Sequence, residues 1–135
     1  MAKNGAKVAA KVTRMGDADW YGLTVIAVIG VGSWLFRFRA IEPFWTVGAC
    51  AAPGRPNFCI PREAVLWLQY QQAFGWTAFI LGAAAFALGR RWLGVLAIAI
   101  GIAAVVNFNA TTGILGASLG LIAWMGVKTG RYKPV

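Results

Sequence analysis

The sequence predicts an all-α membrane protein, a bundle of four transmembrane helices with one ordered loop between the first two. Hydrophobic residues make up 59% of the 135 residues and charged residues only 13%, against about 45–50% and about 25% in soluble domains. The apolar residues form long runs, and the basic residues stand at the ends of those runs. A soluble fold this small could not bury so much apolar surface, so the excess is expected to face lipid.

Four apolar runs are predicted to be the spans, at residues 20–36, 63–89, 92–107 and 111–127. The first has 17 residues without a charge, about the minimum for a helix that crosses a bilayer. Residues 92–127 in one helix would be about 54 Å long. A turn is therefore expected in the cluster of Asn, Thr and Gly between the last two runs.

The segments outside the runs are assigned as one loop and two tails. Residues 37–62 hold four of the five prolines and both cysteines, and are expected to form an ordered loop outside the hydrocarbon. Residues 1–19 and 128–135 are basic and predicted to be cytoplasmic tails, with a surface-lying helix as an equal alternative for 1–19. The small-residue box before Cys50 is too far from the first run for signal-peptide cleavage to be expected.

Basic residues predict the orientation, because cytoplasmic loops carry an excess of Lys and Arg. In the four-span topology nine lie on one side and four on the other. The nine are Lys3, Lys7, Lys11, Arg14, Arg90, Arg91, Lys128, Arg131 and Lys133, and the four are Arg37, Arg39, Arg55 and Arg62. Both termini are therefore expected in the cytoplasm of a bacterium, with the chain in its inner membrane and the loop in the periplasm. No basic face with interleaved aromatics indicates nucleic acid as a partner.

The two cysteines, Cys50 and Cys59, fall in the predicted periplasmic loop. A closely spaced pair in an oxidising compartment predicts a structural disulfide. Closing so short a ring is worth roughly 2–3 kcal/mol. The topology also resembles that of thiol oxidases of the DsbB and vitamin K epoxide reductase type, which use a Cys-x-x-Cys pair beside a quinone and a second cysteine pair. This sequence lacks both pairs, so redox function is kept only as an alternative.

Polar side chains are expected to gather near the outer ends of the last three spans. Gln69 and Gln72 share a helix face through their i, i+3 spacing, and Asn107, Asn109 and Thr112 lie at the same membrane level. Hydrogen bonds between helices are the favoured interpretation. The alternative is a small outward-facing pocket for a quinone, a lipid head group or a pigment.

Small residues four apart predict close contacts between helices. Three such pairs occur, Ala78 with Gly82, Ala97 with Gly101, and Gly116 with Gly120. The contacts could lie within the bundle or with a partner.

Little in the sequence supports catalysis. Histidine is absent and the four acidic residues all lie outside the apolar runs, which removes the usual general base and the usual metal ligand. No metal site and no cofactor are predicted. The leading hypothesis is a non-catalytic accessory subunit, bound to other integral membrane subunits of a larger, energy-transducing inner-membrane complex. A small homo-oligomeric transporter or channel for a neutral or apolar solute is the second hypothesis, and a thiol-disulfide or quinone redox protein the third.

Overall fold

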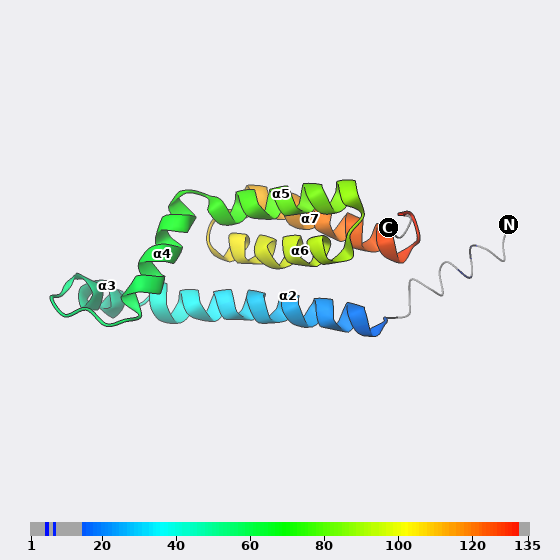
Figure 1. Cartoon of the computed structure of the whole chain (residues 1–135). Coiled ribbons are helices and arrows are strands. Elements are labelled where there is room, and N and C mark those ends of the chain that lie inside the picture. The colour runs from blue at the N-terminus through cyan, green and yellow to red at the C-terminus, as the bar shows by residue number, and fades with distance from the viewer. Residues whose placement is uncertain (1–4, 6, 8–14, 133–135) are drawn as a thin grey trace.

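The computed structural model describes residues 5, 7 and 15–132, and all the regular structure in them is helical. The elements in order are α2 (Asp17–Phe36), the π-helical turn η1 (Arg37–Ile41), α3 (Phe44–Ala51), α4 (Cys59–Tyr70), α5 (Ala73–Leu88), α6 (Arg91–Val106) and α7 (Ala110–Lys128). The long helices α2, α5, α6 and α7 run alongside one another, and α3 and α4 lie at one end of them (Figure 1). Most of the predicted tail 1–19 and the last residues of 128–135 lie outside the described residues.

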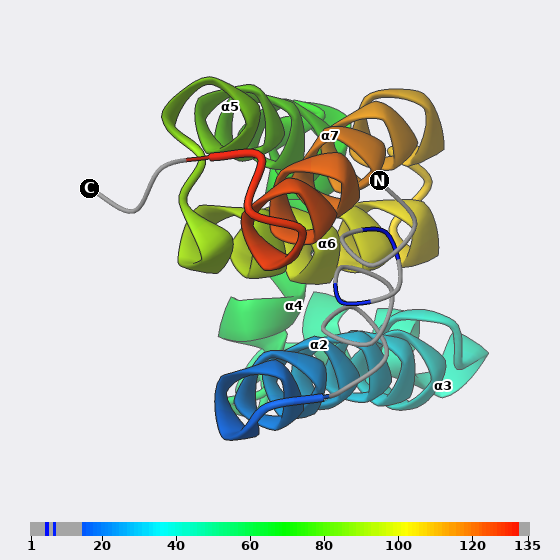
Figure 2. The same ribbon diagram turned by 90° about the vertical axis from the view of Figure 1, so that its right-hand side faces the viewer.

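The helices α5, α6 and α7 pack against one another in a triangle (Figure 2). Glycines set the distance between them: a Cβ atom built at Gly94 would lie 2.6 Å from the Gly120 carbonyl oxygen, and one built at Gly101 would lie 2.7 Å from that of Gly113. With no side chain in the way, the backbones touch directly. Such close approach maximises van der Waals contact, which drives helix association in lipid.

Helix α2 lies outside this triangle, on α6 (Figure 2). Gly22 faces Val95, whose Cγ2 atom would be 3.0 Å from an added Cβ, and Gly30 faces Ile102 at 3.2 Å. The rest of the helix is largely uncovered, with Val28 65% and Val31 56% exposed. In this chain α2 therefore packs through one narrow strip.

The prediction of one continuous helix over 63–89 is wrong. Helices α4 and α5 meet at a 65° bend, and Gln72 between them has a left-handed backbone with φ of 54°. Consequently α4 lies across the end of the bundle, between the level of α2 and that of α5 (Figure 1). The glutamines at 69, 71 and 72 explain why the chain can break here: broken backbone is tolerated near polar groups or water and not in hydrocarbon.

The expected loop over 37–62 is also largely helical. The first helix continues through η1, where the Glu42 N–H donates to the Arg37 carbonyl at 3.0 Å, and α3 and the first turn of α4 follow. Pro43 stands immediately before α3, and Pro61 lies in the first turn of α4. Proline is tolerated at such positions because the first turn of a helix has no internal acceptor for its N–H groups.

The helical class is confirmed, whereas four full-length spans are not shown. Within the described residues, Asp17–Ile41 and Ala110–Lys128 are long and apolar enough to cross a membrane, and α4 with α5 makes a third only if the bent pair is one span. Helix α6 is an apolar helix of 16 residues, with about 24 Å of rise against about 30 Å of hydrocarbon. The chain turns between α6 and α7 at residues 107–109, inside the cluster expected to form a turn.

Candidate functional site

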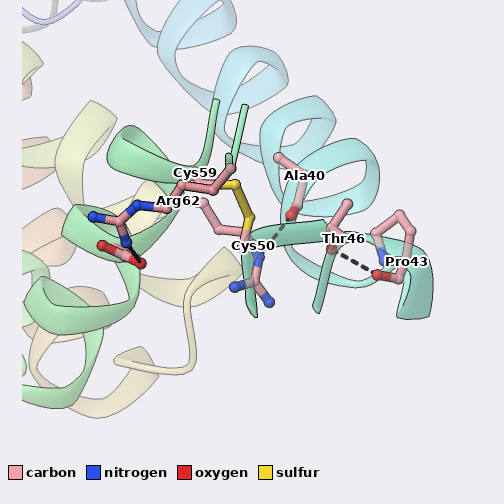
Figure 3. The surroundings of a disulfide bond; sticks show 8 residues. Ala40, Pro43, Thr46, Cys50, Cys59 and Arg62 are labelled. Carbon is pink, nitrogen blue, oxygen red and sulfur yellow. Dashed lines mark hydrogen bonds and ion pairs between the residues drawn. A yellow bond between two sulfur atoms is a disulfide. The ribbon is translucent and has the colours of Figure 1, made fainter. Parts of the chain in front are cut away.

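The disulfide joins the end of α3 to the start of α4 (Figure 3). The sulfur atoms of Cys50 and Cys59 are 2.05 Å apart, and Cys59 is fully buried. The predicted cysteine pairing is thus confirmed. Two hydrogen bonds lie near the disulfide. The Arg62 guanidinium Nε donates to the Ala40 carbonyl at 3.0 Å, and the buried Thr46 hydroxyl donates to the Pro43 carbonyl at 2.6 Å. These contacts fix α3 and α4 to the end of η1 as one unit, which we call the cap (residues 42–70).

A polar hollow of about 330 Å³ lies where the cap meets α5 and the turn between α6 and α7. Its lining residues are Leu66, Gln69, Tyr70, Gln72, Phe108 and Asn109. Three of the five predicted polar residues, Gln69, Gln72 and Asn109, are therefore brought together. They come from two chain segments about 40 residues apart, and the bend between α4 and α5 is what lets them meet.

The other two predicted polar residues do not line the hollow. Asn107 is 4% exposed, and its amide donates to the Ala103 carbonyl at 2.8 Å, which satisfies an acceptor at the end of α6. The Thr112 hydroxyl occupies the space that a side chain at residue 75 would need, so Gly75 and Thr112 form a contact between α5 and α7. Both residues therefore act in packing.

Two amide oxygens in this region lack a donor. Gln69 Oε1 and Asn107 Oδ1 are buried, and no hydrogen-bond donor among the described residues reaches either atom. The Asn109 amide does donate to the Gln69 backbone carbonyl, at 3.4 Å. A buried acceptor without a donor is destabilising by about 1–3 kcal/mol, so each such atom calls for a water molecule or a ligand.

The backbone is unusual at the same place. Within the part of the chain that is described, two non-glycine residues have positive φ, Gln72 at 54° and Phe108 at 60°, and both line the hollow. Non-glycine residues with positive φ are uncommon and persist where the surrounding structure imposes them. The walls of the hollow are thus set by tertiary contacts.

Arg37 contacts Phe108, one of the residues that line the hollow, a role that sequence reasoning missed. Its guanidinium lies 4.0 Å from the centre of the Phe108 ring, and it donates to the Val106 carbonyl at 2.6 Å and to Glu42 Oε1 at 2.9 Å. It therefore connects the end of α2 with the turn between α6 and α7. Its position just after an apolar run was the available signal, but the pattern gave no partner.

A second polar cluster at the opposite end of the bundle was also missed. Asp19 in the first turn of α2 pairs with Lys128 in the last turn of α7 at 3.2 Å, and accepts a hydrogen bond from Trp124 Nε1 at 3.1 Å. The Asp19 side chain is 5% exposed and the Lys128 side chain is 14% exposed. Acidic side chains are stabilising at the start of a helix and basic side chains at its end, so each residue stands at a favourable position in its own helix. Only the fold brings together residues 109 positions apart.

The predicted small-residue pairs all lie at helix contacts within the chain. Ala78 and Ala97 are fully buried. A side chain at Gly82 would collide with the backbone of Gly116, and one at Gly120 would collide with Gly94 and Ala97. Gly101 meets Gly113 and Ala117. These residues hold the triangle of α5, α6 and α7 together.

Among the described residues no cluster of three or more Cys, Asp or Glu side chains could hold a metal ion. The lining of the hollow supplies neutral amides and aromatic rings, while the charged residues of the cap, such as Arg55 and Glu63, pair outside it. No protein-family model, curated protein or solved structure matches this chain.

Proposed function

We propose that this chain is a non-catalytic accessory subunit of a larger protein complex in a bacterial inner membrane, with four spans and both termini in the cytoplasm. The spans are α2 with η1, then α5, α6 and α7, while the cap lies in the periplasmic interface. The Asp19–Lys128 pair supports an even number of spans, because it brings the start of the first long helix and the end of the last to the same end. The bias of nine basic residues to four supports the orientation.

The uncovered face of α2 is the observation that supports a partner subunit. In the most apolar stretch of α2, 11% of the residues are buried within the chain, compared with 33% in α7. On this face lies Gly32, which is exposed and has no atom within 4 Å of the position a Cβ would take. By contrast, each glycine inside α5, α6 and α7 lies against a neighbouring residue.

A glycine at position 32 is unfavourable for the helix unless another contact compensates. A glycine within a helix is less favourable than alanine by about 0.5–1 kcal/mol, and close approach of another backbone is what offsets this in membrane helices. Nothing in the described chain approaches Gly32. A helix of another subunit packed on this face would make the same kind of contact that α5, α6 and α7 make among themselves.

The test is affinity purification of the tagged chain from its own membrane in mild detergent, followed by native mass measurement and partner identification. We expect a complex of fixed stoichiometry that the Gly32→Leu variant fails to form while its helical content stays normal. Ala87→Leu places the same leucine side chain at an exposed position of α5 and is expected to leave the complex intact. A lone monomer or homo-oligomer for the unaltered chain would rule out the accessory role.

A further inference from the structure

We propose that the polar hollow between the cap and the turn of α6 and α7 binds an uncharged, hydroxyl-rich group, the sugar of a glycolipid or a free sugar of the same chemistry. The inference does not depend on the accessory role, because the hollow lies at the cap and the uncovered face belongs to α2, but it rests on the proposed placement of the cap in the membrane interface. Four observations carry it: the charge of the lining, its hydrogen-bonding groups, its aromatic walls and its place in the fold.

The lining favours an uncharged ligand. None of its six residues is Asp, Glu, Lys or Arg, so a phosphate or an ammonium group would meet no charged partner in the lining. Arg37 lies against the Phe108 ring outside the lining, and two of its N–H groups already donate to Glu42 and to the Val106 carbonyl. The part of the ligand that enters is therefore neutral.

The hydrogen-bonding groups favour hydroxyls over carbonyls. Side-chain amides of Gln69, Gln72 and Asn109 both donate and accept, as hydroxyl groups do. Gln69 lines the hollow, and its Oε1 atom is buried and lacks a donor. A hydroxyl can donate to it, whereas the ring of an oxidised quinone only accepts. This difference favours a sugar over a quinone.

The walls and the position suit a ring at the membrane surface. Tyr70 and Phe108 line the hollow and are 85% and 75% exposed, leaving apolar ring surface for the C–H faces of a sugar. Trp67, on the same short helix as Tyr70, is 62% exposed. Aromatic residues gather where lipid head groups begin.

The backbone shows that this shape is imposed. Both positive-φ residues, Gln72 and Phe108, lie in the wall. Glycine at residue 72 would adopt the same φ without strain, yet the chain has glutamine there and so places an amide in the hollow. Strained residues kept in place by their surroundings are concentrated at ligand sites.

The experiment is native mass spectrometry of the purified full chain, disulfide intact, titrated with two lipids of identical acyl chains: monoglucosyl diacylglycerol and plain diacylglycerol. We expect about tenfold tighter retention of the glucosyl lipid. Gln72→Gly removes one amide and relieves the backbone, so it should fold normally and reduce the preference to about twofold or less. Gln69→Leu also removes one amide and should reduce the preference for the glucosyl lipid to the same extent. Gln71→Ala changes an exposed neighbour outside the hollow and should keep the full preference.

A competition experiment distinguishes a free sugar from the sugar of a glycolipid. Displacement of the glucosyl lipid by excess methyl glucoside assigns the site to sugar in general, and no displacement assigns it to a membrane-borne sugar. Equal retention of the two lipids by the unaltered chain would mean that the hollow holds only water and would overturn the proposal. Preferential retention of a short-chain quinone over the glucosyl lipid would overturn it as well.

Discussion

The triangle of α5, α6 and α7 and the helix α2 are attached to the fold by different means. Inside the triangle the backbones touch through glycines such as Gly82 and Gly116, so the contact runs along the length of the helices. Helix α2 makes a narrow contact with α6 and has polar contacts at its two ends, Asp19 with Lys128 and Arg37 with Val106. Backbone contact gives a tightly packed core, whereas α2 remains largely exposed between the polar contacts at its ends.

The largest expected effect is on the triangle. A side chain at Gly116 would meet the backbone of Ala78 and Phe79, which cannot move aside as a flexible side chain can. Gly116→Leu is therefore expected to lower the free energy of unfolding by about 3 kcal/mol or to prevent folding, measured by circular dichroism during titration with a denaturing detergent. Gly32→Leu is the matched control in α2 and should not lower that free energy by more than about 0.5 kcal/mol, since an open helical position accepts leucine. Equal destabilisation by both variants would contradict the contrast between the two regions.

The next effect concerns the cap, which connects α2 to α5. Replacing both cysteines, Cys50→Ser with Cys59→Ser, removes a ring closure worth roughly 2–3 kcal/mol. Because the disulfide lies within the cap, hydrogen exchange should accelerate in residues 44–70 and stay unchanged in α5, α6 and α7. Faster exchange throughout the triangle would show that the core depends on the cap. Intact mass before and after reduction checks that the unaltered chain carries the bond.

The smallest effect is expected at the start of α2. Asp19→Asn removes the charge that pairs with Lys128 but leaves an oxygen to accept from Trp124. The pair lies near the helix ends, where lysine can extend towards water, so we expect a loss of about 1–2 kcal/mol, less than for a pair in a protein centre. Lys128→Met and the double variant complete a thermodynamic cycle. A coupling free energy near zero would mean that the pair does not hold α2 in place.

Sequence alone determined the helical class, the turn between α6 and α7, and the cysteine pairing. Composition and run length suffice for the class, because a chain 59% hydrophobic with few charges cannot fold as a small soluble domain. The turn followed from helix length and from the polar cluster at 107–113. The pairing of Cys50 with Cys59 needed no fold, because the chain has only these two cysteines.

Only the tertiary structure decided how the helices meet. The long helices are apolar on all sides, so no period marks the packing face, as it would in an amphipathic helix. The bend at residues 71–72 was hidden because an apolar run does not tell one straight helix from two. The contacts of Asp19 with Lys128 and of Arg37 with the distant turn join residues 109 and 69 positions apart. Such contacts depend on which helices become neighbours, and that is settled by the shapes of the glycine faces in three dimensions.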